Sequence, residues 1–300
     1  LKFNVDGITE VQRKFFGTLY NTYSFFTLYA NIDGFNFSEK EIPTEERSEL
    51  DRWILSELNS LISLVDDCYA EYEPTKASRA ISDFVSEHLS NWYVRLSRRR
   101  FWKGEYSKDK IAAYQTLYTC LETIAIIMSP VAPFYSDQLF CDLNKVSKRQ
   151  KVSSVHLADF PAVDKKLIDK SLEERMELAQ KISSMVLSLR KKVNIRVRQP
   201  LNKILLPVME KGFKEKVESV RELILAEVNV KDIEYITDTA GILVKKIKPN
   251  FKILGKKVGP LMKDTSNAIL AMNQEQILEF ELKGEYKLGF DKNEVMITAE

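Results

Sequence analysis

Residues 91–102, which read NWYVRLSRRRFW, carry the side chains best suited to binding chemistry. The stretch holds four arginines, several aromatics and no acidic residue, and it lacks Gly and Pro. At 3.6 residues per turn, a helix places four of these side chains on one face: Arg95, Arg98, Arg99 and Trp102. The planar arginine fork matches phosphate oxygens, and adjacent rings offer stacking surfaces for unpaired bases. The pattern indicates a surface for RNA.

The same stretch also fits a solvated basic helix face above a core. Tyr93, together with Leu89 and Leu96, falls on the flank that we expect to pack inward, and Trp92 lies at its margin. Two further basic segments without acidic residues favour the binding interpretation. The first contains Arg190, Lys191, Lys192, Arg196, Arg198 and Lys203. The second contains Lys245, Lys246, Lys248, Lys252, Lys256, Lys257 and Lys263.

Composition limits the kind of partner. With 44% hydrophobic and 29% charged residues, the 300-residue chain is typical of a globular protein of about two domains. The net charge is only +2, so an anionic partner must be met by local clusters rather than by bulk charge. No apolar run suggests a membrane span and the opening residues do not resemble a signal peptide. We expect a monomeric, cytoplasmic piece of a longer protein, without membrane association.

Residues for metal or catalytic chemistry are scarce. Cys68, Cys120 and Cys141 are far apart and form no C-x-x-C pair, which argues against a disulfide framework or a four-thiolate zinc site. His88 and His156 lie in separate regions. The sequence has no nucleophile-elbow, P-loop, H-E-x-x-H or Rossmann motif. We therefore expect no catalytic residue, no metal and no cofactor in this chain.

Apolar periodicity predicts the elements that position the basic residues. Long amphipathic stripes with short connections indicate a mainly α chain that begins with an antiparallel helical bundle, with Trp53 in its core. After Pro200, short β-prone runs alternate with helices, which is typical of a small α+β domain. The predicted boundaries are 1–160 for the bundle, 161–203 for a connecting helix and basic segment, and 204–300 for the C-terminal domain.

Several blocks, in order, resemble one family. NWYVRLSRRRFWKGE follows LDRWILSELNSL and precedes MSPVAPFYSDQLF and SVHLADFP. Together they resemble the anticodon-binding helical domain of class Ia aminoacyl-tRNA synthetases, the isoleucyl enzymes most closely. RKKVNIRVRQPL and NFKILGKKVGPLM resemble the C-terminal part of the longer, eukaryote-like isoleucyl type. The resemblance thus covers nearly the whole chain.

The resemblance implies a chain that grips the anticodon stem-loop of isoleucine tRNA and positions it for a catalytic domain of the same polypeptide. By position, it assigns tRNA contacts to Trp92, Arg95, Arg98, Arg99, Trp102, Arg190, Lys191, Lys192, Arg196 and Arg198. The family's H-x-G-H and K-M-S-K-S motifs, which serve ATP and Mg, do not occur here, so the fragment should be inactive alone. The bacterial type's zinc-binding cysteine cluster is also missing. Alternatives are the same region of a valyl or leucyl enzyme, or a helical protein-interaction module without an RNA role.

Overall fold

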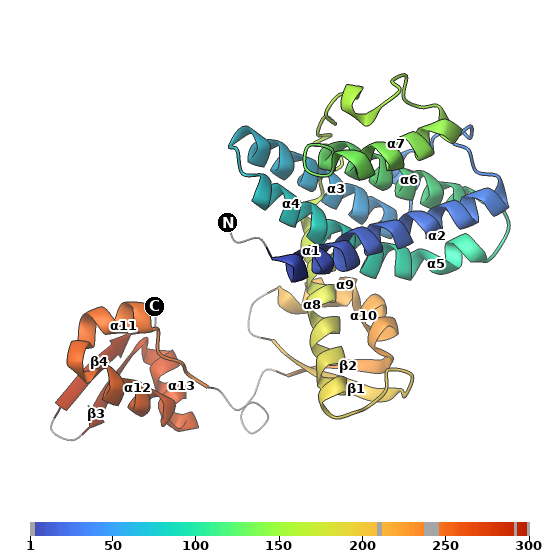
Figure 1. Cartoon of the computed structure of the whole chain (residues 1–300). Coiled ribbons are helices and arrows are strands. Elements are labelled where there is room, and N and C mark those ends of the chain that lie inside the picture. Colours follow the sequence, from blue (N-terminus) through green and yellow to red (C-terminus); the bar gives the residue numbers. More distant parts are fainter. Residues whose placement is uncertain (1–3, 209–211, 237–245, 291–292, 299–300) are drawn as a thin grey trace. The chain divides into compact units, whose positions relative to one another are not determined.

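The computed structural model describes residues 4–208, 212–236, 246–290 and 293–298, and the chain divides into two units (Figure 1). The helical unit comprises Leu1–Val197 and Lys216–Val228, and the second unit comprises Arg198–Glu215 and Asn229–Glu300. The sequence predicted a separate connecting segment at 161–203. The division groups residues up to 197 with the helical unit, in which the helix at Lys170–Lys192 packs against the later helix at Arg221–Val228.

The helical unit is built almost entirely of helices, as the apolar stripes predict. In chain order these are α1 (Val5–Val11), the π-helical η1 (Gln12–Phe16), α2 (Gly17–Asp33), the 3₁₀ turn η2 (Thr44–Glu46), α3 (Glu49–Ala70), α4 (Pro74–Asp83), the π-helical η3 (Phe84–Val94), α5 (Arg95–Trp102), α6 (Lys108–Met128), α7 (Pro133–Ser147), the 3₁₀ turn η4 (Val155–Leu157), α8 (Lys170–Lys192) and α10 (Arg221–Val228). Helix α9 (Phe213–Ser219) runs across the boundary between the units.

Local sequence explains where these helices begin and end. Ser48 caps α3 in a reciprocal pair with Asp51, which satisfies two backbone N–H groups at the helix start. Gly34 ends α2 in the left-handed conformation with φ of 71°, which costs glycine little. Pro74 occupies the first turn of α4, where its missing N–H is not needed.

The helix predicted to carry the arginines is continuous from residue 74 to residue 102 but not regular. Its middle third, η3, has π-helical hydrogen bonding, and the α-helical pattern resumes at α5. Most of η3 is apolar and buried, including Leu89 and Tyr93, as predicted. The arginines therefore begin where the wide π turns end, and α5 holds them at α-helical spacing.

Helix α6 forms the centre of the core. Nearly all of its side chains from Ala112 to Met128 are buried, and Trp53 of α3 is fully buried as predicted. Contrary to the sequence interpretation, α6 is long and apolar enough to cross a membrane. However, 89% of its most apolar stretch is buried within the protein, as in the core helix of a globular bundle.

The described residues of the second unit form two small sheets. Strands β1 (Leu201–Pro207) and β2 (Val230–Ile236) pair in parallel, with Leu201 opposite Val230. Strands β3 (Glu285–Phe290) and β4 (Asn293–Thr298) form an antiparallel pair that packs with α12 and α13. The remaining helices are α11 (Phe251–Val258), the 3₁₀ turn η5 (Gly259–Leu261), α12 (Met262–Leu270) and α13 (Gln274–Lys283). The strand predicted at 243–247 lies largely outside the described residues.

Candidate nucleic-acid interface

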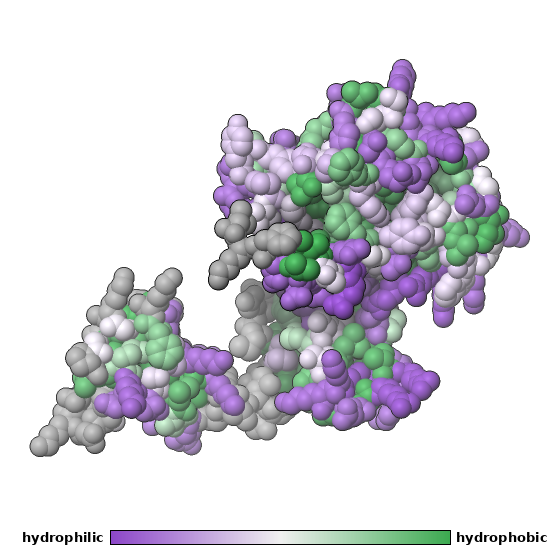
Figure 2. All heavy atoms as spheres, in the orientation of Figure 1, coloured by the Kyte–Doolittle hydropathy of each residue, from purple (hydrophilic) through white to green (hydrophobic). Residues whose placement is uncertain are grey.

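Helix α5 presents Arg98, Arg99 and Trp102 to solvent. Both arginines are exposed, and the Trp102 side chain is 50% exposed. Among the described residues, neither Arg98 nor Arg99 has an ion pair or side-chain hydrogen bond. In Figure 2, hydrophilic residues cover much of the helical unit on the side where α5 lies. Two guanidinium groups and an indole ring are therefore available together for a ligand.

Arg95, the fourth residue of the predicted face, already has a protein partner. Its Nη1 donates to both carboxylate oxygens of Glu227 on α10, at 2.6 and 2.7 Å. Its Nε donates to the carbonyl of Asn91 at 2.6 Å. The Glu227 side chain is only 7% exposed, whereas that of Arg95 is 41% exposed. Arg95 therefore joins α5 to α10 while its side chain stays partly exposed, and its assigned contact with tRNA remains a prediction.

Trp92 does not line the surface, contrary to its assignment by resemblance. Its side chain is buried at 8% exposure, with the Arg95 guanidinium 5.9 Å from its ring centroid. Trp92 lies in the π-helical η3 beside Tyr93, and both residues are buried. The buried rings of Trp92 and Tyr93 fill core volume that would be empty if the tryptophan faced solvent.

Arg100 holds α5 against the start of α3. Its guanidinium donates to both oxygens of the fully buried Asp51 at 2.9 and 2.6 Å, and it also binds Asp109. Burial opposes the charge, but the hydrogen bond to Asp51 and the nearby acidic groups outweigh it and raise the pKa of Arg100. Tyr93 donates to Asp51 at 2.6 Å, and burial followed by the Asp51 charge raises the pKa of Tyr93. This network fixes the position of the free arginines.

The second basic segment also contains both a buried arginine and exposed basic side chains. Arg190, assigned to the tRNA surface, is 3% exposed, and its Nη1 donates to the carbonyl of Arg196 at 3.2 Å. Helix α8 ends there because Asn194 adopts a left-handed φ of 57°, which lets the N–H of Ile195 return to the carbonyl of Arg190. The buried Arg190 stabilises this helix end and cannot line a surface.

The other residues of this segment are exposed, as predicted. They are Lys191, Lys192, Arg196, Arg198 and Lys203, of which Lys203 forms an ion pair with Glu234. The first three belong to the helical unit, and Arg198 begins the second unit. In the lysine-rich segment of the second unit, Lys246, Lys248 and Lys263 are exposed. Lys245 and the side chains of Lys252, Lys256 and Lys257 lie outside the described residues.

Two carboxylates, those of Glu57 and Glu173, lie close together where α8 packs against α3. Glu173 of α8 accepts hydrogen bonds from Ser56 and Ser60 of α3 at 2.5 and 2.8 Å, and from Lys170. Burial, and then the charge of Glu173, raise the pKa of Glu57 on α3 to about 7. The hydrogen bond that Glu57 accepts from Trp53 Nε1 opposes this shift. The joint that orients α8 therefore contains a carboxyl group that titrates near neutral pH.

Comparison with known proteins identifies the family of this interface. Residues 51–205 match the family model described as the anticodon-binding domain of tRNA ligase. The chain belongs to this family. The match begins at Asp51, the residue that holds Arg100, and it includes both α5 and the end of α8.

The relatives of this anticodon-binding domain specify a subgroup. The chain is 58% identical over 299 residues to an isoleucine–tRNA ligase of Bacteroides thetaiotaomicron and 60% identical over 301 residues to one of Cytophaga hutchinsonii. It is 40% identical over 301 residues to an isoleucine–tRNA ligase of Clostridium tetani. Each match covers the whole chain but only 26%, 27% and 28% of the relative. These relatives are bacterial, so they give no support to the eukaryote-like part of the resemblance.

The described part of this anticodon-binding domain contains no group of three His, Cys, Asp or Glu residues placed to hold a metal ion. Burial lowers the pKa of His88, whose Nδ1 lies 3.3 Å from Gln180 Nε2. Cys68 and Cys120 are buried free thiols.

Sequence reasoning missed the roles of Asp51, Glu227 and Asn194. Little in the sequence indicates these roles. Asp51 has the pattern of an ordinary helix cap, and Glu227 resembles any acidic residue on an exposed helix face. Only Asn194 had a usable signal, since Asn after a basic helix end is a common left-handed cap.

Proposed function

We propose that this chain binds the anticodon stem-loop of isoleucine tRNA as part of an isoleucine–tRNA ligase. The observation that carries the proposal is the exposed set Arg98, Arg99 and Trp102 on α5, whose arginines make no ion pair with any described residue. A chain of net charge +2 that leaves two adjacent arginines unneutralised has a local surface suited to an anion.

The arrangement supports a division of roles. Arg98 and Arg99 hold backbone phosphates, because the planar guanidinium can donate two parallel hydrogen bonds to phosphate oxygens. The half-exposed ring of Trp102 stacks on an unpaired base of the loop. Lys191, Lys192 and Arg196 add phosphate contacts at the end of α8. Arg95 and Arg100 act indirectly, by keeping α5 in place through Glu227 and Asp51.

The chemical reaction belongs to the remainder of the protein. The chain spans about a quarter of the length of the relatives it matches. We infer that the whole protein joins isoleucine to tRNA using ATP and Mg, and that this part positions the tRNA for a catalytic domain of the same polypeptide. We further propose that it works as a monomer in the cytoplasm, where thiols such as Cys68 and Cys120 remain reduced.

A salt titration of tRNA binding tests the proposal. The probes are isoleucine tRNA and the same tRNA with its anticodon replaced, each bound to the unmodified chain and to the double variant Arg98→Glu with Arg99→Glu. We expect tighter binding to the native anticodon, and a loss of at least about tenfold in the double variant, with a log–log salt slope smaller by about two.

A charge-matched control is Arg52→Glu with Lys76→Glu, because both residues are exposed on other helices. Equal losses in both double variants would mean that only overall charge matters. Binding unchanged by the α5 substitutions would remove this face from the site. No binding of the unmodified chain at low salt would favour a protein-interaction role.

A further inference from the structure

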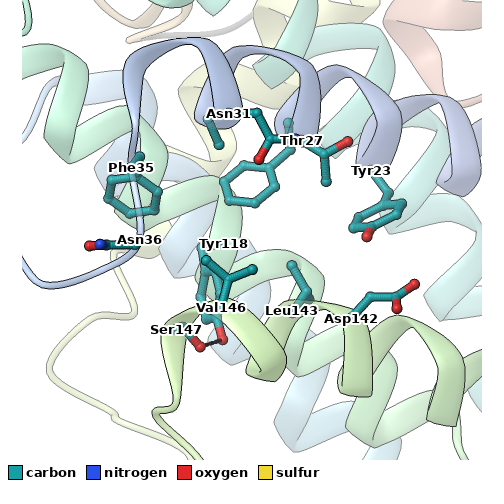
Figure 3. A pocket seen from close by; sticks show the side chains of 12 residues that line it. Tyr23, Thr27, Asn31, Phe35, Asn36, Tyr118, Asp142, Leu143, Val146 and Ser147 are labelled. Atoms are coloured by element: carbon teal, nitrogen blue, oxygen red, sulfur yellow. Dashed lines mark hydrogen bonds between the residues drawn. The ribbon is translucent and has the colours of Figure 1, made fainter.

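A cavity of about 300 Å³ lies between α2 and α7, and no residue of α5 lines it. In Figure 3, side chains of the two helices point toward one another across it, with Tyr23, Thr27 and Asn31 on one side and Leu143 and Asp142 on the other. Ligand cavities in proteins run from about 300 to 1,000 Å³, so this one suits a single small ring system.

The inner wall of the cavity is aromatic and rigid. Phe26, Phe35 and Tyr118 are each no more than 5% exposed. Phe26 packs edge-to-face against the other two rings, with centroids 6.2 and 6.1 Å away. Tyr118 is further fixed by a 2.6 Å hydrogen bond to Ser147. Because the core holds these rings, the aromatic wall of the cavity is already formed before a ligand binds.

The rim of the cavity is polar. Asn31 is exposed, and neither its amide nor the Tyr23 hydroxyl hydrogen-bonds to another described residue. Asp142 accepts one hydrogen bond through Oδ1, from Gln138 at 2.9 Å. In Figure 3 the Asp142 carboxylate and the Tyr23 ring face each other at the same end of the cavity. Amide, hydroxyl and carboxylate groups at one edge of an aromatic slot match a planar ligand with apolar faces and a hydrogen-bonding edge.

A cation lies beside the aromatic wall. The guanidinium of the exposed Arg149 is 4.1 Å from the ring centroid of Phe37 and 5.5 Å from that of Tyr118, which lines the cavity. Stacking on these rings orients the guanidinium and leaves its edge for an anion. An aromatic wall, a polar rim and an arginine correspond to the base, base edge and phosphate of one nucleotide.

We propose that this cavity receives one unpaired nucleobase of the bound tRNA, with an exocyclic amino group donating to Asp142 and the adjoining phosphate beside Arg149. Carboxylates accept well from base amino groups, which favours adenine, cytosine or guanine over uracil. The inference rests on the proposed function, and it adds a second RNA contact separate from α5.

The test fills the cavity without changing charge. Thr27→Trp places a large ring in it, and Leu28→Trp is the matched control, because Leu28 is the next residue of α2 and is 54% exposed. Affinity for isoleucine tRNA is measured with the full chain, together with base-specific chemical probing of the bound tRNA. We expect Thr27→Trp to weaken binding about tenfold, the size of one lost stacked base, with an unchanged salt slope. One unpaired base protected by the unmodified chain should become reactive with this variant only.

If the tryptophan perturbs folding, Asp142→Asn is the alternative variant for the same binding measurement. It should weaken binding severalfold, again without a change in salt slope, since no phosphate contact is lost. If Thr27→Trp is folded and binds with the original affinity and footprint, the cavity is not a base site, while the α5 proposal stands. If the unmodified chain does not bind the tRNA at low salt, both proposals fail together.

Discussion

The two basic segments of the helical unit have similar compositions but are held in place differently. In α5, Arg100 pairs with the buried Asp51, and Arg95 pairs with Glu227. Two of the four arginine charges of α5 are therefore neutralised by ion pairs. At the end of α8, Arg190 instead donates to the backbone carbonyl of Arg196. In both segments the arginine that fixes the helix is the one least exposed, and its neighbours are left for a ligand.

The supports of the two helices also differ in charge. The start of α3 holds α5 through opposite charges, Asp51 against Arg100. The middle of α3 meets α8 through like charges, with Glu57 and Glu173 close enough to raise the pKa of Glu57. Matched charges resist pH change near neutrality, whereas crowded carboxylates do not. The comparison therefore predicts that α8 is the more pH-sensitive of the two.

The largest effect is expected from Asp51→Ala, which removes the main support of α5. Arg100 and the Tyr93 hydroxyl would lose their buried acceptor, and the α3 cap would lose the hydrogen bond from the Ser48 N–H to the Asp51 carboxylate. We expect the free energy of unfolding to fall by about 3–5 kcal/mol, measured by chemical denaturation. The control Asp109→Ala, whose carboxylate is 56% exposed, should cost under about 1 kcal/mol. Equal costs would show that Asp51 is not the dominant partner.

The pH dependence of Glu57→Gln tests the support of α8. The pKa of Glu57 in the folded state is about 7 and its unfolded value is 4.5, so the folded state binds the proton more tightly. Its penalty is absent below pH 4.5, grows as the pH rises, and is complete above pH 7. Glu57→Gln should therefore stabilise the chain by about 2–3 kcal/mol at pH 8 and by little at pH 4. The exposed Glu71→Gln is the control, and identical pH profiles for both variants would contradict the prediction.

Arg190→Met should destabilise the end of α8. Methionine keeps the length of the side chain but leaves the Arg196 carbonyl without its buried donor. We expect a loss of about 1–3 kcal/mol in the thermal unfolding free energy. Lys191→Met, at the neighbouring exposed position, should have little effect on stability. A variant at 190 as stable as the one at 191 would mean that burial of Arg190 has no structural role.

The Arg95–Glu227 pair should contribute less, because Arg95 is partly exposed. A double-mutant cycle with Arg95→Ala and Glu227→Ala should give a coupling free energy of about 0.5–1 kcal/mol. No coupling in the absence of RNA would show that Glu227 does not hold Arg95.

The smallest effect on stability is expected from Lys191→Ala with Lys192→Ala, within about 0.5 kcal/mol. These exposed side chains should matter only for tRNA, whose log–log salt slope should fall by about one for each lost phosphate contact. An unchanged slope would leave α5 as the sole basic surface of the helical unit in contact with RNA.

Much of the fold follows from local patterns. The apolar stripes of α3 and α6, the buried Trp53 and the Ser48 cap depend on residues within a few positions of each other. The π-helical form of η3 was not predicted, because its residues have ordinary helix propensities and only core packing makes the wide turns favourable.

The sequence by itself determined a helical chain with three basic segments and the motifs of one family. Tertiary structure alone decided which basic side chains remain available. Arg100 meets Asp51 across 49 positions, and Arg95 meets Glu227 across 132. The spacing of residues within α5 gives no information about acidic residues so distant in the sequence. Coulomb attraction depends on distance in space, and the fold brings these acids to two arginines while leaving Arg98 and Arg99 to solvent.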